Sequence, residues 1–102
     1  MTQKRQYIYT LRPIPRLLKE ENWTAREEEI TSRHFNYLKA KLAEGKLILA
    51  GKTSGLDEKT FGIVIFEAES CEEAAEFMNG DPGVKEGIMQ AELFPYDIAL
   101  IR

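Results

Sequence analysis

Four short segments of the chain are rich in β-branched, aromatic and other apolar residues, and each predicts a β-strand. Two longer segments space their apolar residues as one face of a helix does. The predicted strands cover residues 6–11, 46–53, 60–68 and 87–94, and the predicted helices cover residues 24–44 and 70–79. We expect residues 13–23 to form a loop with one helical turn, residues 54–59 a hairpin turn, and the apolar tail 96–101 a further short strand.

Capping residues define the ends of both helices. Thr24 with Glu27, and Ser70 with Glu73, have the spacing of a capping box, in which each side chain satisfies a backbone N–H of the first turn. Gly45 follows the first helix at a position where a left-handed residue is common. Gly80 is expected to close the second helix in the same way, and Asp81-Pro82-Gly83 to form a sharp turn after it.

The order of these elements is β-α-β-β-α-β, which predicts an α+β, ferredoxin-like fold. In this fold both helices cover one face of an antiparallel sheet. If the other face met water, apolar and polar residues should alternate along each strand. The strand at residues 60–68 is instead apolar on both sides, with Ile63 and Ile65 opposite Val64 and Phe66. We therefore expect a homodimer that packs sheet against sheet, a dimeric α/β barrel; a monomer with an apolar sheet is the alternative.

The second predicted strand shows the same pattern, with Leu47 and Leu49 expected on one side and Ile48 and Ala50 on the other.

Composition is that of a single globular domain over residues 1–102, with 43% hydrophobic and 30% charged residues. The net charge of −3 comes from interspersed signs, so nucleic acid is not an expected partner. The apolar runs are too short to span a membrane, the segment Met1 to Arg5 does not resemble a signal peptide, and one cysteine suits a reducing, cytoplasmic location.

The single histidine, His34, lies within the apolar arc that Ile30, Tyr37 and Leu38 form on the first helix. It therefore faces the sheet, where an imidazole needs a polar partner. The chain path brings the turn at Asp81 to the same edge of the sheet, and a carboxylate there would fix the tautomer of the imidazole and make it a better base. A core histidine bonded to a backbone carbonyl is the alternative interpretation. One histidine and one cysteine cannot form a His/Cys zinc site within one chain.

Three groups of residues resemble the YCII-related (YciI-like) family: Arg33-His34-Phe35-Asn36-Tyr37-Leu38 with Ala43-Glu44-Gly45-Lys46-Leu47, then Leu49-Ala50-Gly51, and Glu69-Ser70-Cys71-Glu72-Glu73-Ala74 followed by Asp81-Pro82 and Val84-Lys85-Glu86-Gly87. The resemblance covers residues 7–96. It implies a dimeric α/β barrel with a His–Asp pair in a pocket. Among the few members of known activity is a dehydrochlorinase of chlorinated hydroxyquinols, and muconolactone isomerases and heme- or quinone-handling monooxygenases share the fold. This chain departs from the family pattern at Lys52, where proline is common, and at Gly83, where an aromatic is common.

These observations lead to one functional hypothesis. His34 moves a proton on a small aromatic or enol-like substrate, as in a lyase or isomerase that needs no metal or organic cofactor, and Asp81 orients it. Arg12, Lys52 and Ser54 are candidate substrate-binding residues for an anionic group at the same edge, and the alternative is that each lies at a solvated strand end. The alternatives are a dimer that binds a small ligand without chemistry, and a structural dimer in which the pair only fixes the turn at Asp81 to the first helix.

Overall fold

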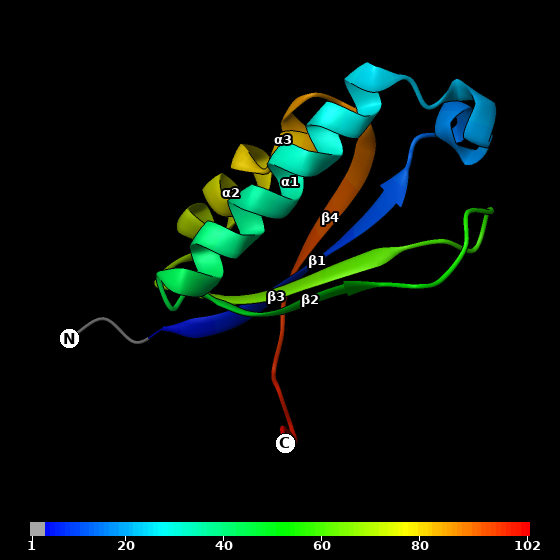
Figure 1. Ribbon diagram of the computed structural model, residues 1–102. Helices are drawn as coiled ribbons and strands as arrows, with labels where there is room; N and C mark the ends of the chain where they lie inside the picture. The colour runs from blue at the N-terminus through cyan, green and yellow to red at the C-terminus, as the bar shows by residue number, and fades with distance from the viewer. Residues whose placement is uncertain (1–3) are drawn as a thin grey trace.

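The computed structural model describes residues 4–102. The expectation about a signal peptide concerned residues 1–5, of which residues 1–3 lie outside the described part. The elements are β1 (Arg5–Pro13), the 3-10 turns η1 (Pro15–Leu18) and η2 (Glu20–Asn22), α1 (Ala25–Ala43), β2 (Leu47–Lys52), β3 (Gly62–Ala68), α2 (Cys71–Gly80), α3 (Pro82–Lys85) and β4 (Met89–Pro95). The strands form one antiparallel sheet in the order β2-β3-β1-β4, and α1 and α2 cover one face of it (Figure 1). The predicted ferredoxin-like α+β fold is confirmed.

Local signals explain most of these boundaries. Thr24 and Glu27 form the complete capping box at the start of α1, and Gly45, with φ of 79°, follows its end. Ser70 accepts a hydrogen bond from the backbone N–H of Glu73 at the start of α2. Because these bonds satisfy N–H groups that a helix cannot satisfy internally, the sequence alone places both helix starts correctly.

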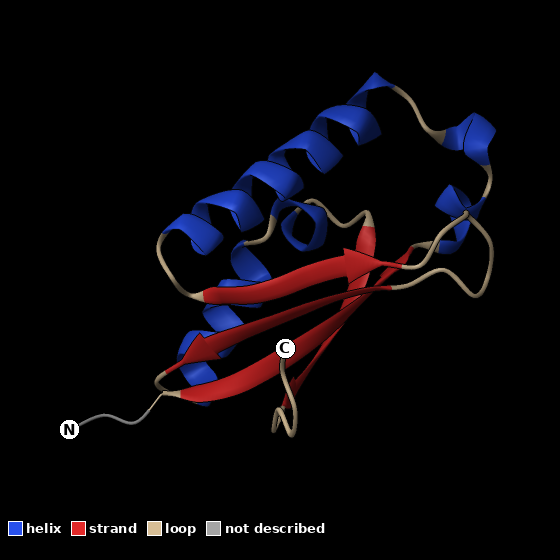
Figure 2. Cartoon of the chain, turned by 60° about the horizontal axis from the view of Figure 1, so that its bottom comes forward, coloured by secondary structure: helices blue, strands red, loops and turns tan. Residues whose placement is uncertain are grey.

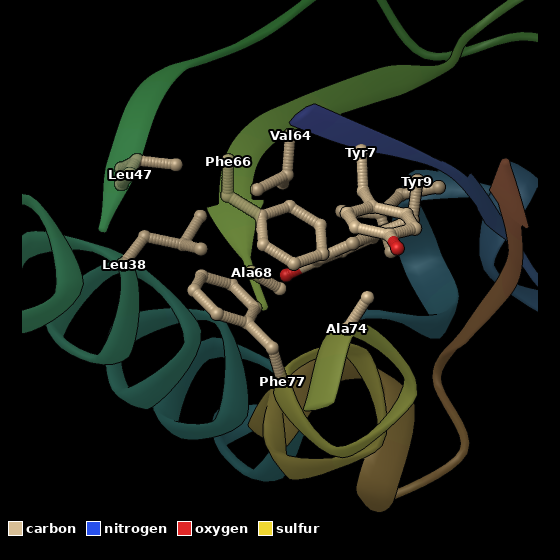
Figure 3. Packing of buried hydrophobic residues seen from close by; sticks show 10 residues of the cluster. Tyr7, Tyr9, Leu38, Leu47, Val64, Phe66, Ala68, Ala74 and Phe77 are labelled. Atoms are coloured by element: carbon tan, nitrogen blue, oxygen red, sulfur yellow. The ribbon is translucent and has the colours of Figure 1, made fainter. Parts of the chain in front are cut away.

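The core lies between the sheet and the two helices. Every second residue of β1, namely Tyr7, Tyr9 and Leu11, points into it and is at most 6% exposed. Phe66 of β3 stacks on Phe77 of α2 with ring centroids 4.1 Å apart, as Figure 3 shows. This packing attaches α2 to the centre of the sheet and places the start of α3 beside β1.

The second helix ends at Gly80 as predicted, but two details of the prediction for this part of the chain are wrong. Asp81-Pro82-Gly83 is not a free turn: Asp81 is the N-cap of the short helix α3, and its side chain accepts from the N–H of Gly83. Gly80 has no positive φ, and it is the last residue of α2. A β-carbon there would lie 2.9 Å from the hydroxyl of Tyr37, so close packing against α1 explains this glycine.

The tail after β4 also differs from the expectation, since residues 96–102 form no strand in the described chain. Tyr96 donates a backbone hydrogen bond to Gln6, after which the chain leaves the sheet on the side away from the helices (Figure 1). Leu100 is 95% exposed. A single backbone bond does not make a strand, and no ladder of further bonds follows it in the described chain.

The second face of the sheet carries no helix (Figure 2). An apolar row crosses it, formed by the paired residues Leu49, Ile65, Ile8 and Phe94, one from each strand. Leu49 was expected on the side of Leu47, and this is wrong: a register shift between them moves Leu49 into the row beside Ile65. One extra residue in a strand reverses the faces of the residues that follow, so simple alternation fails at the irregularity.

Candidate active site

The structure brings the two predicted chemical residues together. The Nδ1 of His34, in the middle of α1, lies 2.6 Å from Oδ1 of Asp81, which precedes α3. His34 keeps 15% of its side chain exposed, whereas Asp81 is completely buried. A carboxylate accepts hydrogen bonds, so this contact requires the proton of the neutral imidazole on Nδ1 and leaves Nε2 as the acceptor.

Two further donors hold the carboxylate of Asp81. The hydroxyl of Tyr9, on β1, donates to Oδ2 over 2.8 Å, and the backbone N–H of Gly83 donates to Oδ1 over 3.0 Å. Burial, together with the nearby charge of Asp81, raises the pKa of the Tyr9 hydroxyl far above its ordinary value, so this group stays a donor. Asp81 thus accepts bonds from three elements, β1, α1 and α3, and its position is fixed before any ligand binds.

His34 forms part of the wall of a cavity of about 360 Å³ between α1 and the β2–β3 side of the sheet. This volume lies within the range of roughly 300–1,000 Å³ typical of small-molecule sites. Three aromatic side chains, Trp23, Phe35 and Phe61, share the wall with His34. The other lining residues are Leu11, Pro13, Thr31, Leu38, Ala50, Gly51, Lys52, Thr60, Gly62, Ile63, Val64, Ile88 and Met89.

Few polar side chains face this apolar space. Thr31 lies one helical turn before His34, and its hydroxyl oxygen is buried without a hydrogen-bond partner within residues 4–102. Such a group costs free energy unless a ligand or a water molecule satisfies it. Thr60 is satisfied locally, because its hydroxyl oxygen accepts from the N–H of Asp57 over 2.9 Å. On the α1 side of the cavity, His34 is therefore the polar group that combines partial exposure with free bonding capacity, whereas the hydroxyl oxygen of Thr31 is covered.

The predicted substrate-binding residues take different positions. Lys52 lines the cavity, with its ammonium group 2.8 Å from the carbonyl oxygen of Thr53. Arg12 does not line it, but its guanidinium lies over the ring of Phe61, 5.4 Å from the centroid. Ser54 lies in the β2–β3 loop and is not among the lining residues. Lys52 and Phe61 thus line the cavity, and the contact of Arg12 with Phe61 places the end of β1 just outside that wall.

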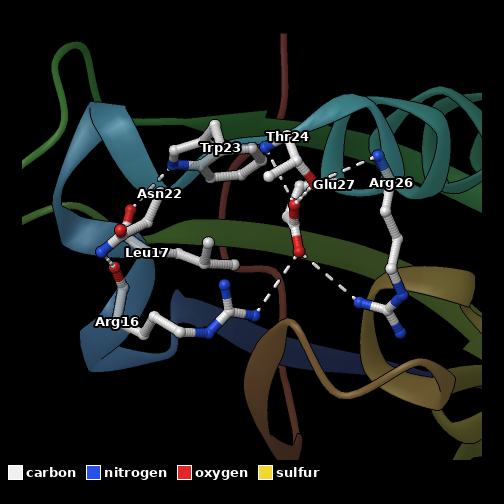
Figure 4. A network of polar contacts seen from close by, with 7 residues as sticks. All are labelled: Arg16, Leu17, Asn22, Trp23, Thr24, Arg26 and Glu27. Atoms are coloured by element: carbon white, nitrogen blue, oxygen red, sulfur yellow. Dashed lines mark hydrogen bonds and ion pairs between the residues drawn. The ribbon is translucent and has the colours of Figure 1, made fainter.

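A polar network around the buried carboxylate of Glu27, with two arginine partners that are more than half exposed, holds the loop before α1 (Figure 4). Glu27 accepts from both the backbone N–H and the hydroxyl of Thr24, and it pairs with Arg16 and Arg26 at 3.5 Å each. The bonds from Thr24, ahead of the bond from Arg16, lower the pKa of Glu27 to about 2. The indole N–H of Trp23 donates to the carbonyl of Leu17 over 2.8 Å. Residues 13–23 therefore form an ordered loop with two 3-10 turns, of which Pro13 and Trp23 line the cavity.

Sequence reasoning missed three contributors: Tyr9, the N–H of Gly83, and Met89. A signal existed for Tyr9, since alternation along β1 directs it into the core, where a tyrosine hydroxyl usually has a partner. The N–H of Gly83 would have followed from reading Asp81-Pro82 as a helix start, because proline is common at the first helical position. Nothing in the local sequence marks Met89, whose place in the wall depends on contacts with distant residues.

Two classes of feature are not found within residues 4–102. No group of three or more His, Cys, Asp or Glu side chains is placed to hold a metal ion. No helix of this part of the chain is both long and apolar enough to cross a membrane.

Comparison with known proteins places the chain. The 5-chloro-2-hydroxyhydroquinone dehydrochlorinase TftG from Burkholderia phenoliruptrix AC1100, solved with 2,5-dihydroxybenzoquinone, shares 23% identity and a TM-score of 0.67 over 90% of this chain and 93% of its own. The uncharacterized protein TM1266 from Thermotoga maritima shares 11% identity and a TM-score of 0.56 over 93% of this chain and all of its own. At these identities the likeness shows the fold alone. No curated protein matches the chain. The model of the YCII-related domain matches residues 7–96, and the protein therefore belongs to the YCII-related family.

Proposed function

We propose that this protein is a small acid–base enzyme of the lyase or isomerase kind, in which His34 transfers a proton and Asp81 orients it. One observation carries the proposal. The imidazole stands in the wall of an apolar cavity, and its Nδ1 is anchored to a fully buried carboxylate, which leaves Nε2 free to accept a proton. A buried carboxylate beside a histidine stabilises the positive charge that the imidazole gains when it accepts a proton.

The chemistry needs only groups present in the chain. Nε2 of His34 takes a proton from a hydroxyl or an activated C–H group of the substrate, and the resulting imidazolium is stabilised by the carboxylate of Asp81, 2.6 Å away. Return of that proton to another substrate atom gives an isomerisation. Departure of a leaving group as an anion gives an elimination, after which the imidazolium, whose side chain is 15% exposed, releases the proton to solvent. The apolar walls lower the local dielectric constant beside the imidazole, which strengthens the His–Asp interaction.

The walls favour a compact ring as the substrate. A cavity of about 360 Å³ has room for one substituted ring, and Trp23, Phe35 and Phe61 offer it aromatic contacts. Oxygen substituents would find Nε2 of His34 or, at the rim, the ammonium group of Lys52. We assign Arg12 and Ser54 to the outer part of the site, where they would attract an anionic substituent. A hydroxylated aromatic or enol-like compound combines these requirements, and the ligand of the structurally similar TftG is of this kind.

We also propose that the protein acts as a homodimer. The row of Leu49, Ile65, Ile8 and Phe94 leaves apolar surface exposed on the face of the sheet that no helix covers, with Leu49 and Phe94 each 44% exposed. Cover by a second copy would bury this row on both protomers at once, because a two-fold interface repeats the same patch.

Chloride release from 5-chloro-2-hydroxyhydroquinone tests the enzyme proposal. The assay compares the wild type with His34→Ala and His34→Asn, since asparagine can hydrogen-bond to Asp81 but cannot take up a proton near neutral pH. We expect turnover in the wild type and a loss of about 10²-fold or more in both variants. Wild-type turnover in either variant would refute the role of His34.

A parallel titration with 2,5-dihydroxybenzoquinone separates the alternatives. The wild type could bind 2,5-dihydroxybenzoquinone and yet release no chloride, either from 5-chloro-2-hydroxyhydroquinone or from related halogenated rings. This result would support the ligand-binding dimer instead of the enzyme. Neither binding nor turnover, together with a large loss of stability in His34→Ala, would favour the structural pair and would refute the proposed substrate class.

A further inference from the structure

Gly83 stands where a side chain would collide with the cavity wall. A β-carbon built on this buried glycine of α3 would lie 2.9 Å from the sulfur of Met89 and 3.2 Å from its terminal methyl group. Met89 is the first residue of β4 and lines the cavity that contains His34. The thioether therefore occupies the space left by the missing side chain.

No other feature of Gly83 demands glycine. Its φ is not positive, so an L-residue fits the backbone. Its N–H donates to Asp81, and alanine offers the same donor. A β-carbon would lie 3.5 Å from Oδ1 of Asp81, which is an ordinary contact distance. The principal consequence of a side chain at position 83 is thus a displacement of Met89.

The cavity offers free space beside the displaced methionine. Its side chain is unbranched and flexible, so its end can move at low cost. The atoms around it are packed, since Met89 contacts both groups of buried core residues, and the empty volume adjoining it is the cavity. Enlarging residue 83 would therefore push the thioether into the cavity and reduce the room for a ligand.

We propose that Gly83 and Met89 form a coupled pair that sets the size of the ring substituent accepted beside His34. The inference rests on the proposed function, because it takes the cavity as the substrate site. The ligand class is a single aromatic ring that carries a hydroxyl for His34 and an apolar substituent toward Met89, whose polarisable sulfur makes favourable contacts with ring edges.

Binding of two phenols tests the pair. The probes are phenol and 4-propylphenol, and the dissociation constants are measured from the NMR signals of the imidazole, which belong to one residue because the chain holds one histidine. In Gly83→Ala we expect 4-propylphenol to bind at least about tenfold more weakly, with phenol changed by less than about threefold, since one methylene in a pocket is worth roughly 10–200-fold.

The control is Gly83→Ala made in a protein that already lacks the methionine side chain at position 89. In Met89→Ala, the additional change Gly83→Ala should alter neither dissociation constant by more than about twofold. Met89→Val, which ends at its γ-carbons and so lacks both the sulfur and the terminal methyl group, replaces Met89→Ala if the latter fails to fold. An equal effect of Gly83→Ala on both phenols, an effect that persists without Met89, or no phenol binding at millimolar concentration would each overturn the inference.

These measurements do not depend on catalysis. A wild type that binds phenols with the expected dependence on Gly83 and Met89 but releases no chloride would retain this pair and lose the proposed reaction. Chloride release with no selective effect of Gly83→Ala would do the opposite.

Discussion

The two members of the His–Asp pair should differ sharply in what they contribute to stability. Asp81 is completely buried and accepts from Tyr9, His34 and Gly83, whereas His34 is partly exposed to the cavity and makes one bond. We expect Asp81→Ala to destabilise the fold severely and His34→Ala to do so only mildly. The prediction separates a residue that organises the fold from one held ready for chemistry.

The magnitudes follow from the bonds lost. Without Asp81, α3 loses its N-cap, at about 1 kcal/mol, and the fully buried hydroxyl of Tyr9 loses its acceptor, at about 1–3 kcal/mol. With the loss at His34 added, the total is roughly 3–5 kcal/mol, a large part of the ~5–15 kcal/mol that stabilises a typical domain. In His34→Ala, Asp81 keeps two donors and water can enter from the cavity, so the cost is about 1 kcal/mol.

Urea unfolding followed by the fluorescence of Trp23 measures these costs, at one fixed protomer concentration because a dimer is stabilised by mass action. Thermal melts give a second reading, in which 1 kcal/mol corresponds to about 4–8 °C for a domain of this size. If Asp81→Ala does not fold, Asp81→Asn provides a milder change that keeps one oxygen. A cost of His34→Ala equal to that of Asp81→Ala would show that the histidine holds the fold together, and the enzyme proposal would then be withdrawn.

Three further predictions concern other parts of the molecule. Thr31→Val should stabilise the protein by about 1 kcal/mol in urea unfolding, because it removes a buried hydroxyl without a partner within the described chain; a loss of stability would show that the hydroxyl is satisfied. The pKa of Glu27 is lowered to about 2 from 4.5, so its carboxylate contributes stability that is present above pH 4.5 and is lost as the pH falls toward 2. Urea unfolding should therefore show the advantage of the wild type over Glu27→Gln shrinking across that range, and a constant difference would contradict the pairing. Phe94→Asp should convert a dimer into a folded monomer of 11.7 kDa in light scattering, since Phe94 is exposed on the free face of one protomer; an unchanged mass would refute the proposed interface.

Local chemistry in the sequence determined the fold class and the helix starts. Thr24, Glu27 and Ser70 satisfy backbone groups within three residues of themselves, so their effect does not depend on the rest of the chain. The helical spacing of Ile30 and Leu38 likewise directs His34 toward the sheet. The β-α-β-β-α-β order then brings the start of α3 to α1, which is why the approach of His34 and Asp81 could be predicted without coordinates.

Contacts between distant residues decided the rest. The register shift in β2 depends on pairing with β3, so alternation alone placed Leu49 on the wrong face. The bond from Tyr9 to Asp81 joins residues 72 positions apart, and the sequence shows only that a buried hydroxyl needs some partner. The position of Met89 depends on an absent side chain at Gly83, a steric relation that exists only once α3 is packed against the start of β4. Spacing along the chain thus determines which residues share a face, whereas the shape of the cavity depends on packing between elements, which spacing does not encode.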